Sequence, residues 1–382
     1  MIYLDNCATT KTRKEVLEKI YKSMVEDFAN PSSLHRLGLK SEKALEESRS
    51  IIADFLQVKD KEIFFTSGGT ESNNIAIQSI INNRKRFGKH LISSKIEHPS
   101  VLNILKEYER KGYHVDYIST DKYGNLDIGE FENCLRDDTI LVSIIHVNNE
   151  LGIIQNLTEI RQAIDKKSPK AYFHIDGIQS FGKIDIDFHG FRPDSFSFSG
   201  HKVYGPKGVG GLYVREGLSL GPIVFGGNQE KGLRSGTENL HGILGFGEAV
   251  RILSKAARKE RNQVREVRDY MVDRIESEIK DIKINSQLDN SSPYIVNISF
   301  KDTRGEVLLH YLEDKGIYIS TTSACSSKGT DKSHVLKAIG LTDKEIEGSV
   351  RICFSYETTK EDIDYVIKNL KSSVEEIRKI MR

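Results

Sequence analysis

Short apolar runs alternate with helix-length segments over the first two thirds of the chain. The runs are rich in β-branched and aromatic residues, and they predict strands at residues 62–66, 90–93, 114–118, 139–146 and 172–175. Between them, residues 99–111 and 157–167 place apolar side chains at helical spacing. Alternation of this kind predicts an α/β fold whose mostly parallel sheet is covered on both faces. Functional loops are then expected beyond the carboxyl ends of the strands.

The pattern changes in the last third of the chain. Residues 254–280 are rich in charge but keep apolar residues at helical spacing, which predicts a long exposed helix joining two bodies. A smaller α+β unit follows, with expected strands at 294–300, 317–320 and 349–354, a helix at 305–315, and a last helix that begins after Thr359. We therefore predict a large domain at 14–257 and a small domain made of 1–13 and 258–382.

Composition limits the class of protein. Lysine and arginine total 56 residues and aspartate and glutamate total 55, so the net charge of +1 provides no field to recruit nucleic acid or an anionic membrane. No stretch approaches ~18 consecutive apolar residues, and the first residues lack the features of an export signal. The cysteines lie far apart without metal-ligand spacing, so no metal is predicted. These features predict a cytoplasmic enzyme with reduced thiols, at positions 7, 134, 325 and 353.

The most informative segment is 197–208, where Lys202 lies between a predicted strand and a loop of glycine and proline. A lysine held between rigid elements is suited to act as a Schiff-base nucleophile, although a lone loop lysine is usually only solvated. A second segment, 65–74, predicts a strand, a glycine pair and a helix start. Such a helix start binds phosphate through backbone N–H groups, although a simple capped turn has the same pattern.

Three further segments end predicted strands or open helices with polar side chains. Asp176 closes an apolar strand and could keep a heteroaromatic ring nitrogen protonated, or could cap a helix. His98 precedes a proline that can open a helix, where an imidazole can stack on a ring and shuttle protons or serve as a cap. Asn149 ends another strand with an amide. Cys325 lies in a small, polar loop, unlike a structural cysteine in apolar surroundings.

Taken together, these segments resemble the NifS/IscS-type cysteine desulfurases, which are pyridoxal-phosphate enzymes of the aspartate-aminotransferase fold, fold type I. The resemblance runs nearly from end to end. It is carried by YLDNCATT (3–10), NPSSLHRLG (30–38), TSGGTESNN (66–74), KIEHPSV (95–101), HVNNELGIIQ (146–155), HIDGIQSFGKI (174–184), FSGHKVYGPKGVGGLYV (198–214), GGNQEKGLRSGTEN (226–239), TSACSS (322–327) and SVRICFSYETT (349–359). The fold implied is a large domain with a mostly parallel seven-stranded sheet and a small α+β domain.

The resemblance also implies a role for each matching residue. Lys202 would hold pyridoxal phosphate as a Schiff base, His98 would stack on the ring and assist proton transfer, and Asp176 would pair with the ring nitrogen. Arg351 would bind the substrate carboxylate, and Cys325 would accept the sulfur. The remaining cofactor contacts implied are Gln179 and Asn149 (the latter also toward substrate), then Gly69, Thr70, Ser199, His201 and, across a dimer interface, Thr237.

The reaction implied is removal of sulfur from L-cysteine, which gives L-alanine and a persulfide on Cys325. A homodimer and a sulfur-acceptor protein are implied as partners, the acceptor being an iron–sulfur scaffold or a tRNA-thiolation enzyme. The alternatives are a selenocysteine lyase, an aminotransferase or another pyridoxal-phosphate lyase on the same fold. A non-catalytic scaffold is a further alternative, which the intact Lys202, Asp176, His98 and Arg351 disfavour.

This chain departs from the family pattern at four places. Cys7 adds a thiol near the start, Gly69 replaces an alanine and is expected to loosen the turn, and Thr322 replaces a glycine. The segment 353–357 also differs from the usual sequence after Arg351. We expect these changes to affect efficiency, loop motion and partner choice while the cofactor stays the same.

Overall fold

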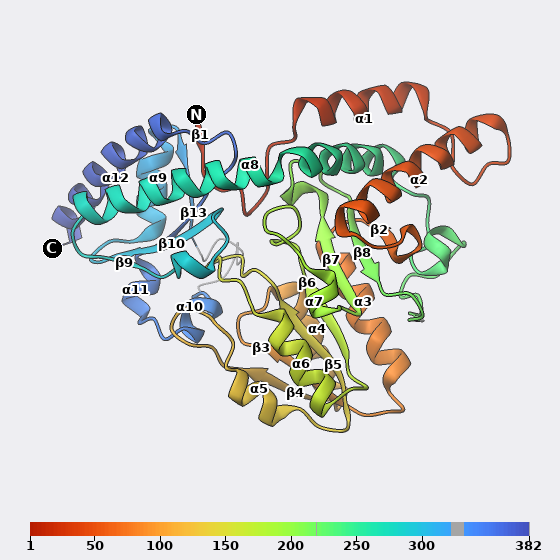
Figure 1. Ribbon diagram of the computed structural model, residues 1–382. Coiled ribbons are helices and arrows are strands. Elements are labelled where there is room, and N and C mark those ends of the chain that lie inside the picture. Colours follow the sequence, from red (N-terminus) through yellow and green to blue (C-terminus); the bar gives the residue numbers. More distant parts are fainter. Residues whose placement is uncertain (219, 322–331, 382) are drawn as a thin grey trace.

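The computed structural model describes residues 1–218, 220–321 and 332–381, and it shows a larger and a smaller unit of helices and strands joined along helix α8 (Leu240–Glu278) (Figure 1). Within these residues, the larger unit has a seven-stranded sheet of order β2-β8-β7-β6-β5-β3-β4. Neighbouring strands from β4 to β7 are parallel, and β8 runs antiparallel to both β7 and β2. The predicted α/β fold with a mostly parallel sheet is confirmed. Its strands are β2 (Ile63–Thr66), β3 (His90–Ser94), β4 (His114–Ile118), β5 (Thr139–Ile145), β6 (Tyr172–Asp176), β7 (Ser195–Ser199) and β8 (Gly210–Val214).

Helices cover both faces of this sheet, because the strands are apolar on both sides. One apolar core lies between the sheet and α3 and α4, and the other lies between the sheet and α2, α5, α6 and the first half of α8. Buried parallel strands require such double cover. The helices of this unit are α1 (Lys14–Glu26), α2 (Arg36–Leu56), α3 (Gly69–Arg84), α4 (Pro99–Arg110), α5 (Ile128–Cys134), α6 (Leu157–Lys167) and α7 (Phe188–Phe191).

The smaller unit packs helices on an antiparallel sheet of order β12-β13-β10-β9. Helices α9 and α12 and the second half of α8 supply its apolar core, together with Leu4 and Cys7 from the start of the chain. Strand β1 (Ile2–Tyr3) pairs with β11, so the N-terminal segment belongs to this core. The other elements are β9 (Ile282–Ile284), β10 (Ile295–Phe300), α9 (Gly305–Glu313), β11 (Ile317–Tyr318), β12 (Ser320–Thr321), α10 (His334–Ala338), α11 (Asp343–Glu347), β13 (Ser349–Cys353) and α12 (Lys360–Met381).

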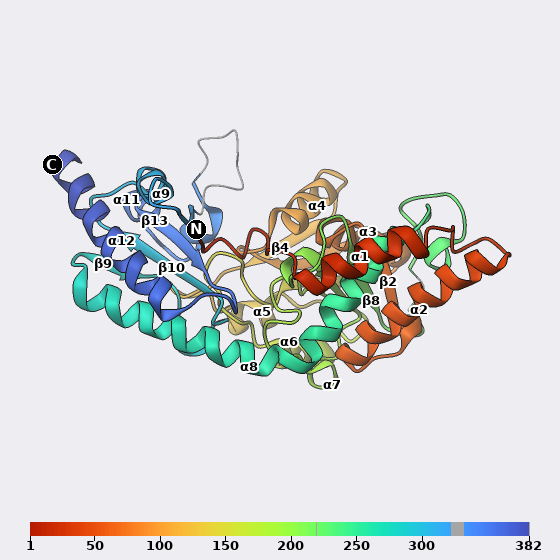
Figure 2. The ribbon, with the colours of Figure 1, turned by 90° about the horizontal axis from the view of Figure 1, so that it is seen from above.

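Helix α8 differs from the predicted exposed helix at 254–280. It begins at Leu240 and runs along both units (Figure 2). It buries residues along its whole length, first in the core of the larger unit and then in that of the smaller one. The sequence pattern did not predict this start, because the first turns contain glycines and glycine is a poor helix former. They are needed for space: a Cβ on Gly245 would lie 2.6 Å from Ile20, and one on Gly247 would lie 2.8 Å from Ser48. The helix therefore lies close against α1 and α2.

Parallel strands bring polar side chains to one edge of the large sheet. Asp176 and Ser199 end the neighbouring strands β6 and β7, and His98 follows the end of β3. Such an edge is where α/β sheets bind ligands. Among the residues that the structure describes, no helix is long and apolar enough to cross a bilayer.

Candidate active site

Lys202 is presented at the carboxyl end of β7 by a 3₁₀-turn, Gly200–Lys202. Its Nζ donates to the main-chain carbonyls of Cys7, at 2.5 Å, and Ala8, at 2.9 Å. Both carbonyls belong to the N-terminal segment, which crosses from the core of the smaller unit. The half-buried amine is thus held at the boundary of the two units.

Asp176 ends β6, next to the strand that leads to Lys202. Its side chain is buried, and its two oxygens accept from Asn73 Nδ2, at 3.0 Å, and from the backbone N–H of Ile178, at 3.1 Å. A carboxylate has about four acceptor sites, so two donors leave capacity for another. A buried carboxylate with an unused acceptor site favours a cationic N–H partner.

A hydrogen-bonded chain links Asp176 to His98 through two residues to which the sequence analysis assigned no role. Asn73 Nδ2 donates both to Asp176 and to Ser100 Oγ, the latter at 2.9 Å. Ser100 Oγ in turn lies 2.8 Å from Nδ1 of His98. Asn73 and Ser100 are within the matched segments 66–74 and 95–101, but only the fold shows that they meet.

The imidazole of His98 is fixed in one tautomer. As the N-cap of α4, its Nδ1 accepts from the backbone N–H of Ser100 at 3.1 Å, so the ring proton of the neutral form is on Nε2. Burial lowers the pKa of His98 below its ordinary value, against an opposing effect of Asp176 and with a smaller contribution from Lys202. His98 is therefore neutral at neutral pH and carries a transferable proton on Nε2.

The N-terminus of α3 forms a cradle that is suited to an anion. The helix begins at Gly69 and Thr70, where the first N–H groups of an α-helix lack intrahelical partners and attract negative charge. Ser199 Oγ is buried without a hydrogen-bond partner and lies beside Gly68, 3.9 Å from where a Cβ there would be. A buried hydroxyl without a partner is costly unless a ligand completes it. The cradle therefore fits a phosphate group.

Gly69 has a different physical role from the one expected. Its φ is not in the left-handed region, and a Cβ at this position would lie 2.1 Å from Ile178 Cδ1. Glycine is therefore required here for space, and the expected loosening of the turn stays a prediction.

His201 and Thr237, which are also predicted to bind the phosphate, lie in different surroundings from each other. His201 Nδ1 is 3.2 Å from Thr9 Oγ1, and burial together with nearby lysines lowers the pKa of His201 to about 4, so this imidazole is neutral. Thr237 is exposed in the loop before α8, where it lines a cleft with Phe65 and Arg234. The structure of a single chain does not place Thr237 with Lys202 or Asp176.

Arg351 reaches the site from β13 of the smaller unit. Its guanidinium donates to Asp5 at 2.9 Å, to Ser320 Oγ at 3.1 Å and to the carbonyl of Asn149 at 3.0 Å. Its Nε is buried without a partner. Burial opposes the charge, but Cys353, Cys7 and Asp5 outweigh it and raise the pKa of Arg351, so the guanidinium stays charged. An arginine with an unused donor is suited to bind a carboxylate.

Cys7 interacts with both Lys202 and Arg351, and Gln179 contacts the Cys7 carbonyl. Gln179 Nε2 donates to the Cys7 carbonyl at 3.0 Å, and its Oε1 accepts from Lys183 at 2.8 Å. The Cys7 thiol is buried and accepts a hydrogen bond from Cys353. Burial alone would raise the pKa of Cys7, but this hydrogen bond and the cations Lys183, Arg351 and Lys202 lower it below its ordinary value.

Cys325 lies outside the described residues. The structure does describe both flanks of its segment. On one side, Ser320 accepts from Arg351; on the other, Ser333 caps α10 and donates to the buried carboxyl of Glu150 at 2.5 Å. The described residues on one side of this segment therefore contact Arg351, and those on the other side contact Glu150, which follows Asn149.

Comparison with known proteins gives consistent matches over the whole chain. The Aminotransferase class-V family model matches residues 2–366. The cysteine desulfurase IscS of Dictyoglomus turgidum is 41% identical over 379 residues, which cover 99% of this chain and 96% of the relative. The cysteine desulfurase IscS of Clostridium botulinum is 39% identical, with 99% and 96% covered.

Solved structures give the same result. A NifS-like protein superimposes with a TM-score of 0.93 and 34% identity, covering 98% of this chain and 99% of the other. A NifS-like protein from Rickettsia africae has a TM-score of 0.88 and 31% identity, with 98% and 99% covered. SspA, solved in complex with cysteine, has a TM-score of 0.82 and 36% identity, with 94% and 100% covered.

Proposed function

This chain belongs to the NifS/IscS-type cysteine desulfurases of the class-V aminotransferase family, and we propose that it uses pyridoxal phosphate to remove sulfur from L-cysteine. The products are L-alanine and a persulfide on Cys325. The observation that carries the proposal is the position of Lys202 and Asp176 at the ends of two paired strands, with Lys202 and Arg351 both donating to the N-terminal segment, at Cys7 and Asp5. An amine nucleophile, a ring-nitrogen partner and a carboxylate ligand together suit amino-acid chemistry on this cofactor.

The residues present fit pyridoxal phosphate. The phosphate would be held by the start of α3 at Gly69 and Thr70 and by Ser199 Oγ, which otherwise has no partner. The ring nitrogen would donate to Asp176, whose orientation Asn73 fixes. When bound, the protonated cofactor ring withdraws electrons from the amino acid.

Substrate binding and proton transfer fall to four residues. Arg351 would bind the carboxylate of cysteine with its free Nε–H, next to its contact with Asp5. Lys202 Nζ would take the proton from the substrate Cα, and His98, whose transferable proton is on Nε2, would act as a proton donor to the substrate. The thiolate of Cys325 would then attack the substrate sulfur: an S–S bond forms as the C–S bond breaks, the thiol proton stays on the persulfide, and the electron pair stays on the substrate carbon, which takes a proton to give alanine.

A homodimer is part of the proposal. Helix α1 and the loop after it carry exposed apolar side chains at helical spacing: Leu17, Tyr21, Met24 and Phe28, with exposures from 54% to 73%. Exposed apolar surface of this extent is typical of an interface. A second copy on this side would cover it and would bring Thr237 toward the neighbouring phosphate. The persulfide would pass to an acceptor in the cytoplasm, an iron–sulfur scaffold or a tRNA-thiolation enzyme.

The test is product formation from L-cysteine by the purified protein, with Cys325→Ala run alongside. We expect alanine and a labelled persulfide from the unmutated protein, and little alanine from Cys325→Ala with cofactor absorbance retained. Cys134→Ala, a change in the α5 thiol, is the matched control and should leave alanine release unchanged. Pyruvate as the product, or equal rates with and without Cys325, would instead indicate a lyase or an aminotransferase.

A further inference from the structure

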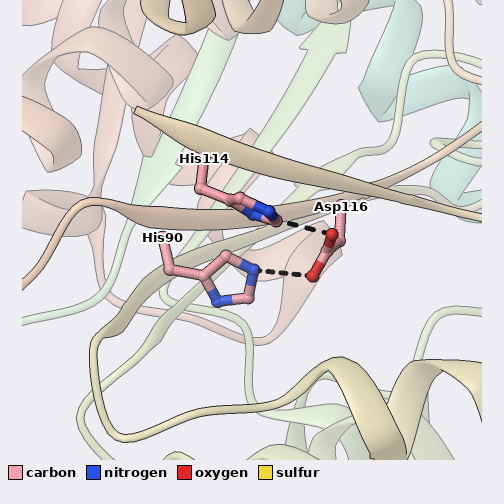
Figure 3. Close-up of side chains that lie close together, drawn as sticks. All are labelled: His90, His114 and Asp116. Carbon is pink, nitrogen blue, oxygen red and sulfur yellow. Dashed lines mark hydrogen bonds and ion pairs between the residues drawn. The ribbon is translucent and has the colours of Figure 1, made fainter. Parts of the chain in front are cut away.

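Two histidines and an aspartate meet at the end of the large sheet away from His98. His90 and His114 are the first residues of β3 and β4 and are paired in the parallel register, and Asp116 lies two residues further along β4. Figure 3 shows both rings directed toward the Asp116 carboxylate. Their ligand atoms lie within 4.8 Å of one another, with His90 Nε2 3.0 Å and His114 Nδ1 3.6 Å from carboxylate oxygens.

The fixed member of this group is His90. Its side chain is fully buried, and its Nδ1 lies 2.8 Å from Thr139 Oγ1 at the start of β5. A metal-binding histidine commonly uses one ring nitrogen for the metal and gives the other to a neighbouring oxygen, which fixes the ring. Burial, aided by Arg136, lowers the pKa of His90 and favours the neutral imidazole that metals bind.

The other two members face solvent and provide access. The side chains of His114 and Asp116 are 61% and 28% exposed. The Cys134 thiol, at the end of α5, also hydrogen-bonds to Asp116, so a fourth group that zinc accepts is close by. The opposing group is Arg136, whose guanidinium nitrogen is 3.1 Å from His114 Nδ1. Its side chain is 42% exposed, which leaves it free to turn into solvent.

We propose that His90, His114 and Asp116 bind a divalent transition metal of the zinc type, at the end of the large sheet opposite the candidate active site. Two imidazoles and a carboxylate are a common zinc donor set. His90 comes from β3, whereas His114 and Asp116 lie two residues apart on the neighbouring strand β4, and the distance in sequence between the two strands hides the site from spacing motifs. Because β4 is the edge strand of the sheet, the metal joins this edge to its neighbour β3. The site is structural, and it is independent of the proposed cofactor chemistry.

The experiment titrates Zn²⁺ into the purified protein by calorimetry, in a Cys325→Ala background so that the loop thiol does not compete. Co²⁺ serves as a spectroscopic probe of the coordination geometry. We expect saturable binding of one ion per chain and a metal-dependent rise in Tm of about 3 °C. His114→Ala, at an exposed position that the fold tolerates, should weaken binding at least ~100-fold.

Two further variants make the result specific. His310→Ala removes an exposed histidine that also pairs with a carboxylate, Glu313 at 3.2 Å, and should leave zinc affinity unchanged. Arg136→Ala removes the competing cation and should tighten binding, a gain that general damage to the fold would not produce. The proposal is overturned if zinc does not bind saturably, or if His114→Ala binds zinc as tightly as its parent.

Discussion

The ammonium group of Lys202 donates to the main-chain carbonyl of Cys7 over 2.5 Å. The side chain of Cys7 belongs to the apolar core of the smaller unit, whereas Lys202 follows a strand of the larger one. Cys7 therefore joins the position of the Lys202 amine to the packing of the smaller unit. The carbonyl also accepts from Gln179, so the contact is held from two directions.

The first prediction concerns Lys202 itself. Lys202→Ala should lower kcat by at least ~10³-fold, because no other amine replaces the nucleophile, and should remove the visible absorbance of the cofactor bound as a Schiff base. Absorbance spectra and alanine release measure both effects. Lys207→Ala, an exposed lysine five positions along the same loop, is the control and should match the unmutated protein. Normal turnover by Lys202→Ala would refute the assignment.

The second prediction concerns charge beside Arg351. The pKa of Cys7 is lowered, so its thiol ionises below the ordinary thiol value of ~8.5 and places a negative charge near Arg351. This charge weakens attraction for the substrate carboxylate as pH rises. Cys7→Ala should therefore lower KM by about threefold at pH ~8 and change it little at pH ~5, with kcat nearly unchanged. An equal effect on KM at both pH values would contradict this account, and Cys134→Ala serves as the control thiol.

The third prediction concerns His98. Because burial lowers its pKa, the ring stays neutral as pH falls through ~6.5 and gains a proton only at lower pH. The decline of kcat on the acid side that depends on His98 should therefore lie below pH ~6.5. His98→Phe keeps an aromatic ring but removes the proton, so it should retain cofactor and lose ~10²–10⁴-fold in kcat. An acid-side decline that is the same in His98→Phe would assign it to another group.

Strand ends and motif positions could be predicted from the sequence, because apolar runs of β-branched residues mark buried strands and polar residues follow them directly. Asp176 and Lys202 were found in this way. Asn73 could not be found, since its role comes from contacts with Asp176 and Ser100 across three elements. The start of α8 was also missed, because its glycines oppose helix formation locally and are explained only by close packing.

The fourth prediction tests the space at Gly69. Gly69→Ala places a methyl group on Ile178 and should cost about 1–3 kcal/mol in the free energy of unfolding, while weakening cofactor retention at the adjoining helix start. Ile178→Ala removes the clashing atoms, so Gly69→Ala should cost much less in that background. Denaturant unfolding of the four proteins in this cycle measures the coupling. Additive effects would show that the two residues do not compete for the same volume.

The fifth prediction concerns Glu97, which is fully buried one position before His98. Its Oε1 accepts from Ser94 Oγ at 2.6 Å and from the backbone N–H of Ile145 at 2.9 Å, while its Oε2 has no partner. Burial raises the pKa of Glu97 to about 8, although these hydrogen bonds oppose the shift. The folded protein therefore keeps this proton at neutral pH, whereas the unfolded chain loses it near ~4.3.

The sign of the effect on stability follows from proton binding. Between pH ~4.3 and about 8 the folded state binds the extra proton, so the contribution of Glu97 to the free energy of unfolding falls as pH rises, by at most ~1.4 kcal/mol per pH unit. Glu97→Gln keeps the accepting oxygen and does not titrate. Its stability relative to the unmutated protein should rise steadily from pH ~5 to ~8, as measured by denaturant unfolding. Glu42→Gln, at an exposed position, should show no such trend. A pH-independent difference for Glu97→Gln would mean that the buried carboxyl is already ionised in the folded protein.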